Sequence, residues 1–375
     1  QLAWSGGYSF DFDLDADIGT GDQSACLCFR VGPDAPAPQR VIAPGEPIRT
    51  PEMHLGLMQA DLDAAIQAMH DHLRQTVFPR QPDELAGLVL SGIGPEQNIT
   101  YESVYHEMDT AAALGAEVFF IDAGWYTPLV PGASGVPEWY ATVGDWNVDL
   151  TRFPQGLGPI RDRAHEKGMR FGLWIDAERI GRQSRIAQAH PEWVAVAYDG
   201  QQRLGDLLDL TAPGAAEWME SEIARVFTEN EVEFFKLDHN TPVTDHAQTE
   251  QTGFTENISW RYYETLYGIY ERLRQRFPNV YFQNCAGGGG RTDIGLMRHF
   301  YDTLVSDWHV APRSFSIFNG MTMALPPEYC NGLLGEGVRG HQAASLDFQA
   351  RILLFGHPLV AFLNPVPSQL NPVQA

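Results

Sequence analysis

The sequence predicts an α/β fold: a (β/α)8 TIM barrel preceded by the remnant of an N-terminal β-sandwich domain and a linker helix. Residues 1–52 alternate apolar and polar residues between turn residues, as in "YSFDFDLD" and "ACLCFRV", which is typical of antiparallel strands. Residues 57–78 carry apolar residues at helical spacing and predict the linker helix. Short apolar strands then alternate with amphipathic helices over a length that suits an eight-stranded barrel. We therefore expect two domains, residues 1–82 and 83–375.

Eight segments of the second domain have the apolar runs of buried parallel strands. They are residues 87–92, 117–124, 170–178, 233–240, 280–285, 302–307, 321–326 and 358–365. Helices are expected between them at residues 101–115, 157–168, 215–230, 259–277 and 345–356. A doubly wound open sheet is the alternative, but the turn "SGIGPEQ" after the first strand lacks the glycine spacing of a phosphate-binding turn.

Composition restricts the classes of partner. The chain has 375 residues and a formal net charge of −23, which disfavours nucleic acid and anionic membrane surfaces as partners. It has no apolar run long enough to span a membrane, and no signal peptide opens it. The four cysteines show neither a disulfide framework nor zinc-ligand spacing, so we expect a cytoplasmic protein. Residue 1 is Gln and the chain starts within a β pattern, as expected of a fragment or a processed form.

Polar and charged residues recur where the predicted strands end. They are Asp122, Asp176 with Glu178, Lys236 with Asp238, Asn284 with Cys285, and Asp307. Because the active site of a (β/α)8 barrel lies at the C-terminal ends of its strands, we expect these side chains to face one site. Lys236 is one of only two lysines and lies in an apolar strand, where an ionised group is costly unless it is paired or used. A structural ion pair with Asp238 is the alternative interpretation.

The residue types at this rim suit carbohydrate chemistry. Glycoside hydrolysis needs two carboxyl groups in different protonation states. Asp238 beside an ammonium suits the ionised partner, and Asp307 suits the protonated one if its setting raises its pKa. Tryptophans near the rim suit stacking on sugar rings, although each one alone is more typical of core packing; they are Trp125, Trp146, Trp174 and Trp308. A magnesium site made of three of the rim carboxylates is the alternative.

Several ordered blocks resemble a known family. They are "FFIDAGW", "GDWNVDLTRFPQGL", "HEKGMRFGLWIDAE", "HPEW", "LLDLTAPG", "FFKLDHN", "NCAGGGGRTD" and "SDW". Over residues 85–310 the chain is similar to the family 36 glycoside hydrolases, the retaining α-galactosidases of clan GH-D. The resemblance implies that Asp238 is the nucleophile and Asp307 the general acid/base of a double displacement, with the two carboxyl groups about 5–5.5 Å apart.

The resemblance also implies a set of sugar contacts. The predicted substrate-binding residues are Asp122, Trp146, Trp174, Lys236, Asn240, Cys285, Gly288, Arg291 and Trp308, with Arg291 shaping the glycine-rich loop. The expected partner is an oligosaccharide or another glycoside. No metal or organic cofactor is required by this chemistry, and members of the family often form homo-oligomers.

Departures from the family pattern concern specificity. The family's paired aspartates are Asp122 and Ala123 here, so one hydrogen-bond acceptor for the sugar is lost, which costs about 1–3 kcal/mol. After Asp307 the family's second aspartate is replaced by Val310, and Arg313 lies one residue early. An α-galactosidase is therefore the leading hypothesis. The alternatives are a raffinose-synthase-type transglycosylase, a relative with altered glycone specificity (α-N-acetylgalactosaminidase or α-glucosidase), and a non-catalytic carbohydrate-binding barrel.

Overall fold

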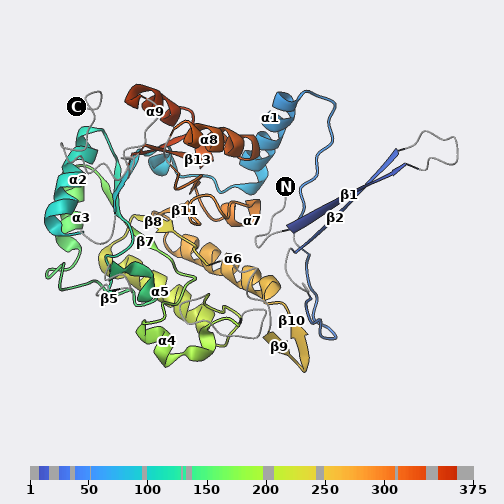
Figure 1. Cartoon of the computed structure of the whole chain (residues 1–375), viewed down its shortest axis with the longest axis horizontal. Coiled ribbons are helices and arrows are strands. Elements are labelled where there is room, and N and C mark those ends of the chain that lie inside the picture. The colour runs from blue at the N-terminus through green and yellow to red at the C-terminus, as the bar shows by residue number, and fades with distance from the viewer. Residues whose placement is uncertain are drawn as a thin grey trace.

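A closed barrel of eight parallel strands forms the centre of the protein (Figure 1). The computed structural model describes residues 8–16, 25–33, 39–50, 52–94, 99–127, 130–131, 137–196, 207–241, 249–308, 311–334 and 345–360. The strands follow one another around the barrel in chain order, and the last strand pairs with the first through Leu359 and Leu90. The predicted (β/α)8 barrel is thus confirmed, and the open doubly wound sheet is excluded.

The barrel strands are short and almost wholly buried. They are β3 (Leu90–Ile93), β4 (Val118–Ile121), β7 (Arg170–Ile175), β8 (Phe234–Leu237), β11 (Tyr281–Asn284), β12 (Asp302–Leu304), β13 (Cys330–Leu334) and β14 (His357–Val360). Seven of them overlap the predicted strands. Four two- or three-residue strands form hairpins in the intervening loops: β5 (Val130–Pro131) with β6 (Pro137–Glu138), and β9 (Thr249–Gln251) with β10 (Phe254–Glu256).

The seventh predicted strand, residues 321–326, is wrong. Most of that segment is the last turn of a helix, α8 (Arg313–Ala324), and the barrel strand is β13, which begins at Cys330. A six-residue apolar run fits a buried helix end as well as a buried strand. Pro326 and Pro327 then end the helix, because proline cannot continue its hydrogen bonding, and a 3₁₀ turn leads into β13.

Helices cover the outside of the barrel. The predicted ones are confirmed as α2 (Tyr101–Ala113), α3 (Gly158–Glu166), α5 (Ala215–Asn230), α6 (Ser259–Arg276) and α9 (Leu346–Leu353), and α4 (Arg185–Ala189) and α7 (Ile294–Met297) are shorter additions. α6 buries Tyr262, Leu266, Ile269 and Leu273, whose spacing of three or four residues places them on one face toward the barrel. None of the helices in the described ranges combines the length and apolar character that crossing a membrane requires.

The first part of the chain forms an antiparallel hairpin, β1 (Tyr8–Ala16) with β2 (Ala25–Pro33), that projects from the barrel (Figure 1). The linker helix is present as α1 (Leu62–His72), continued by a π-helical turn over Leu73–Val77. The alternation expected in residues 40–50 does not produce a strand. The division into domains at residue 82 stays a prediction.

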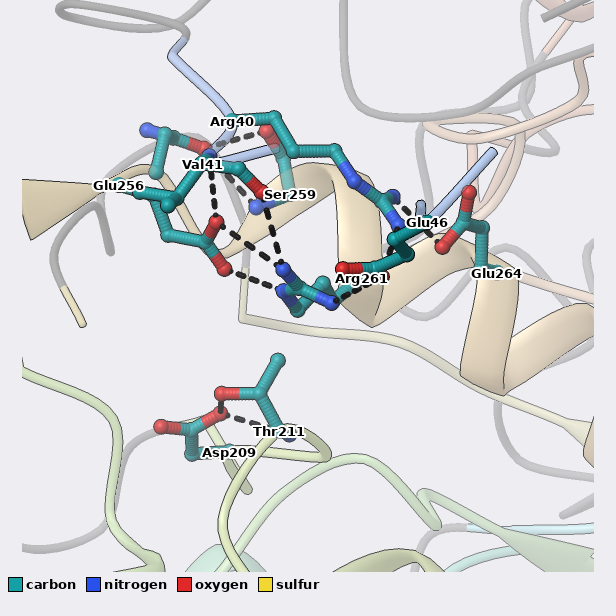
Figure 2. A network of polar contacts seen from close by, with 10 residues as sticks. Arg40, Val41, Glu46, Asp209, Thr211, Glu256, Ser259, Arg261 and Glu264 are labelled. Carbon is teal, nitrogen blue, oxygen red and sulfur yellow. Dashed lines mark hydrogen bonds and ion pairs between the residues drawn. The ribbon is translucent and has the colours of Figure 1, made fainter. Parts of the chain in front are cut away.

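The segment before α1 is attached to the start of α6 (Figure 2). The backbone N–H of Val41 donates to the buried carboxylate of Glu256 at 2.8 Å, and Arg261 donates to the same carboxylate at 2.5 Å. Arg40 pairs with Glu264 at 2.6 Å, one helical turn further along. The contacts of Arg40 and Val41 join residues more than two hundred positions apart, so the extended segment is fixed on the barrel without belonging to a sheet.

Aromatic rings fill the barrel beneath its C-terminal rim. Phe120 of β4 and Phe234 of β8 stack with ring centres 5.3 Å apart. A Cβ atom added to Gly92 would lie 2.5 Å from the Phe120 ring, so only glycine leaves room for it. Lys236 Nζ lies 5.2 Å from the centre of the same ring. The layer of aromatic rings therefore forms the apolar base of the site, directly beneath the charged residues of the rim.

Candidate active site

Asp238 follows the end of β8 and accepts four hydrogen bonds. Its Oδ2 accepts from Trp174 Nε1 at 3.1 Å and from Asn240 Nδ2 at 2.8 Å. Its Oδ1 accepts from the backbone N–H groups of His239 at 2.8 Å and Gly287 at 2.9 Å. Asp238 is only 9% exposed, so nearly all of its polar capacity is met by protein donors.

The pKa of Asp238 is lowered in this setting. Burial alone would raise it, but the ammonium of Lys236 and the hydrogen bonds from Gly287, Asn240 and His239 favour the charged form and outweigh burial. The carboxyl group is therefore ionised at neutral pH, as an attacking carboxylate must be.

Lys236, two residues earlier on β8, is paired with Asp122 at the end of β4. Lys236 Nζ donates to Asp122 Oδ2 at 2.7 Å, and Asp122 Oδ1 accepts the backbone N–H of Ala123 at 2.8 Å. Burial alone would lower the pKa of Lys236, but the charges of Asp122 and Asp238 raise it above its ordinary value. The lysine thus remains an ammonium, and the charge alternates along Asp122, Lys236 and Asp238.

Asp307 lies beyond the end of β12, where its side chain reaches solvent. The surrounding protein raises its pKa by burial; the charge of Lys236 opposes this, and the charges of Asp238 and Asp122 raise it further. The two carboxyl groups of the predicted pair therefore have opposite protonation preferences, the pKa of Asp238 being lowered and that of Asp307 raised.

The glycine-rich loop after β11 connects the two aspartates. Gly287 donates to Asp238, and the next residue packs against the Asp307 backbone. Gly288 has φ of +84°, and a Cβ atom there would lie 2.6 Å from the backbone N of Asp307. Only glycine combines that conformation with so close an approach. Cys285, at the start of this loop, is buried, and burial followed by the charge of Asp238 raises the pKa of its thiol, which stays neutral.

The predicted tryptophans have different places. Trp146 and Trp174 belong to a buried aromatic cluster, with ring centres 6.3 Å apart, and Trp174 reaches Asp238 from it. Trp125 lies deeper and donates to the Trp174 carbonyl at 2.9 Å. Trp308 is 47% exposed, and the guanidinium of Arg313 lies 4.6 Å above its ring. Trp308 therefore forms the outer, solvent-facing edge next to Asp307.

A buried ion pair that the sequence did not predict supports the glycine-rich loop. Arg291 donates to both carboxylate oxygens of Glu178, at 2.8 and 2.6 Å, and Tyr262 of α6 donates to Glu178 at 2.8 Å. Burial alone would raise the pKa of Glu178, but Arg291 and His239 lower it to about 2. Arg291 is thus directed at Glu178, and its part in shaping the sugar-binding loop stays a prediction. The two partners are 113 positions apart in the sequence, so no local sequence pattern predicts their pairing.

The magnesium alternative is not supported by this arrangement. Glu178 is occupied by Arg291, and Asp176 contacts Asn240. Within the described ranges, no three His, Cys, Asp or Glu side chains are grouped so that they could hold a metal ion.

Asn284, at the end of β11, turns away from the rim, because its amide donates to the Arg291 carbonyl and to Thr303 Oγ1.

The fold and the rim define a barrel of the kind that glycoside hydrolases use, with an ionised carboxylate, a buried ammonium and a second carboxyl group at the strand ends. Residues 48–360 match the family model described as Melibiase. The chain belongs to the melibiase family.

Curated relatives include α-galactosidase 2 of Pediococcus pentosaceus, which is 27% identical over 381 residues, covering 100% of this chain and 49% of the relative. The α-galactosidase of Escherichia coli is 28% identical over 389 residues, covering 100% of this chain and 50% of the relative. The chain thus spans about half the length of the curated relatives it matches.

Solved structures agree with the barrel. The galactosidase domain of the α-galactosidase–sucrose kinase AgaSK is 25% identical, with a TM-score of 0.70 over 83% of this chain and 42% of that one. The family 36 α-galactosidase AgaB from Geobacillus stearothermophilus is 23% identical, with a TM-score of 0.73 over 84% of this chain and 43% of that one. The predicted resemblance to the family 36 glycoside hydrolases is confirmed.

Proposed function

We propose that this chain carries the catalytic barrel of a retaining α-glycoside hydrolase that acts on terminal α-linked galactosides. The observation that carries the proposal is the state of Asp238: a buried, ionised carboxylate with four hydrogen-bond donors and an ammonium two residues away. The names of the relatives support the galactoside, and AgaA from Geobacillus stearothermophilus, 21% identical, has been solved with stachyose and with raffinose.

The reaction proceeds by two displacements at the anomeric carbon. Asp238 attacks that carbon and forms a glycosyl ester, while the glycosidic bond breaks and Asp307 gives its proton to the leaving oxygen. Asp307, now ionised, takes a proton from water, and the resulting hydroxyl displaces Asp238 from the sugar. Asp238 must begin charged and Asp307 protonated. The directions of their pKa shifts fit these states, because the pKa of Asp238 is lowered and that of Asp307 is raised.

The sugar that is attacked is held by the rest of the rim. Asp122 and Lys236 bind hydroxyl groups on one side, while Trp146 and Trp174 form an aromatic wall. The remaining predicted contacts are Asn240, Cys285, the backbone at Gly288, Arg291 through the loop it supports, and Trp308 on the side of the leaving group.

An altered glycone preference is the second candidate, and Ala123 is the observation that favours it. The buried methyl group of Ala123 occupies the position of the family's second aspartate, and its N–H group already occupies Asp122 Oδ1. A sugar whose hydroxyl groups need two carboxylates here would lose one partner. Ala123→Asp should then raise activity on the α-galactoside relative to the other sugars.

A panel of aryl α-glycosides tests the function. Galacto, gluco, N-acetylgalactosamino and L-arabino substrates would be given to the chain, to Asp238→Ala and to Asp307→Ala, with the surface variant Asp162→Ala as control. We expect cleavage that Asp238→Ala abolishes and the control retains. Cleavage by Asp238→Ala at the wild-type rate would refute the proposal, and sugar binding without cleavage of any substrate would indicate a non-catalytic barrel. Products formed at high acceptor concentration separate hydrolysis from transfer.

A further inference from the structure

Asp176 follows the last residue of β7 and is linked through Asn240 to Asp238, the carboxylate that attacks the sugar. One nitrogen atom connects the two groups: Asn240 Nδ2 donates to Asp238 Oδ2 at 2.8 Å and to Asp176 Oδ2 at 3.0 Å. Both N–H bonds of the amide are used, so its plane is fixed by two carboxyl groups. Removing either acceptor would leave the amide free to rotate about its side-chain bond.

Asp176 cannot be a ligand for the sugar in this position. Its side chain is 0% exposed, and its Oδ1 has no hydrogen-bond partner among the described residues. An ionised carboxylate with an unpaired oxygen in a dry interior is strongly disfavoured, whereas a carboxylic acid avoids most of that cost. The burial of this residue therefore favours its neutral form.

The charges around Asp176 favour the same form. Asp238 faces it from the end of β8, and Glu178 and Arg179 follow it in its own segment. Tyr270 faces it from α6. Burial, followed by the charge of Asp238, raises the pKa of Asp176 well above its ordinary value; the hydrogen bond from Asn240 and the charge of Arg179 oppose this without reversing it.

We propose that Asp176 is a positioning residue that acts as a neutral carboxylic acid: it holds the Asn240 amide in the orientation that donates to the nucleophile Asp238. This inference rests on the proposed function, because it gives Asp238 the role of nucleophile. A neutral Asp176 orients the donor without adding a second negative charge beside Asp238. The site thereby keeps one ionised carboxylate and a fixed donor within the same hydrogen-bonded chain.

Two substitutions separate orientation from charge. Asp176→Asn keeps the shape and an acceptor oxygen, whereas Asp176→Ala removes the acceptor. For Asp176→Ala we expect at least a tenfold fall in kcat/KM, and a rise of about one unit in the pKa of the acidic limb of its pH profile, because Asp238 loses an oriented donor. For Asp176→Asn we expect a smaller loss and an acidic limb that does not move. Asn240→Ala should resemble Asp176→Ala, and combining the two should add little.

Infrared spectroscopy of the chain with isotope-labelled aspartate gives a readout that does not depend on turnover. We expect a band of a protonated carboxyl group at neutral pH that is lost in Asp176→Asn and kept in Asp307→Ala, which distinguishes it from a band of Asp307. The absence of that band would overturn the neutral form, as would a shift of the acidic limb to lower pH in Asp176→Asn, which would reveal a lost negative charge. Wild-type kinetics in Asp176→Ala would overturn the positioning role. If the wild-type chain cleaves no glycoside, the proposed function fails, and the band still decides the state of Asp176.

Discussion

Replacing Lys236 by methionine removes the ammonium between Asp122 and Asp238 while keeping most of the side-chain volume. The Lys236 side chain is 6% exposed and pairs with Asp122 at 2.7 Å. Removing one partner of a buried ion pair costs about 3–5 kcal/mol of unfolding free energy, because the other charge is left behind. The Asp122 side chain is 20% exposed and can regain some water, so we expect about 3 kcal/mol.

The same change should alter the titration of Asp238. Lys236 is the first group that lowers the pKa of this carboxyl group against the effect of burial. The loss of Lys236 should raise the pKa of the acidic limb of kcat/KM. As the pH is lowered, the variant should therefore lose activity at a higher pH than the wild type does. The whole pH profile would be measured on the best aryl glycoside of the panel, together with urea unfolding.

The second lysine provides a matched control. Lys167 also pairs with an aspartate, Asp109, at 2.8 Å, but both side chains are partly exposed, at 30% and 49%. Lys167→Met should change the unfolding free energy by less than about 0.5 kcal/mol and leave the pH profile unchanged. Equal losses of stability for the two methionine variants, or an acidic limb unmoved in Lys236→Met, would refute the reasoning.

Three further changes give independent tests. Asp307→Ala should slow cleavage more for glycosides with poor leaving groups than for activated ones, because only the former need a proton; equal losses across a leaving-group series would contradict this. Gly288→Ala should lower kcat at least tenfold, because the added Cβ atom would meet the Asp307 backbone. The control Gly156→Ala, where the added Cβ atom has open space, should retain kcat. An unchanged kcat in Gly288→Ala would contradict the close approach. Burial lowers the pKa of His357, but the charge of Asp302 outweighs burial and raises the pKa above its ordinary value. The protonated ring therefore stabilises the fold fully below about pH 6.5, and this stabilisation is lost as the pH rises through the higher pKa of the folded state. Urea unfolding of His357→Asn, measured across this pH range, should lack the dependence.

Local patterns predicted those parts of the fold that depend on neighbours in the chain. The helix expected at residues 215–230 is α5 with the same bounds, because its apolar spacing and its glycine start are local signals. The seventh strand was misplaced because β13 contains Asn331 and Gly332, which are poor strand formers, while the apolar run before it fits a helix. Burial within the barrel, and not local propensity, makes β13 a strand.

The candidate site follows the same division. Asp122, Lys236, Asp238 and Asp307 could be proposed from strand ends and from the family resemblance. The pairing of Glu178 with Arg291 could not, because it depends on how two loops and α6 meet in space. The neutral state of Asp176 was also beyond the sequence, since the same residue type beside a strand end is usually charged and solvated.

The most direct test of the central claim is to trap the glycosyl ester. The chain would be treated with an activated fluorinated α-galactosyl donor, and the labelled peptide identified by mass spectrometry. The proposed mechanism predicts one sugar bound to the Asp238 carboxylate and a first product with retained anomeric configuration. A sugar on another residue, or cleavage with inverted configuration and no ester, would contradict it.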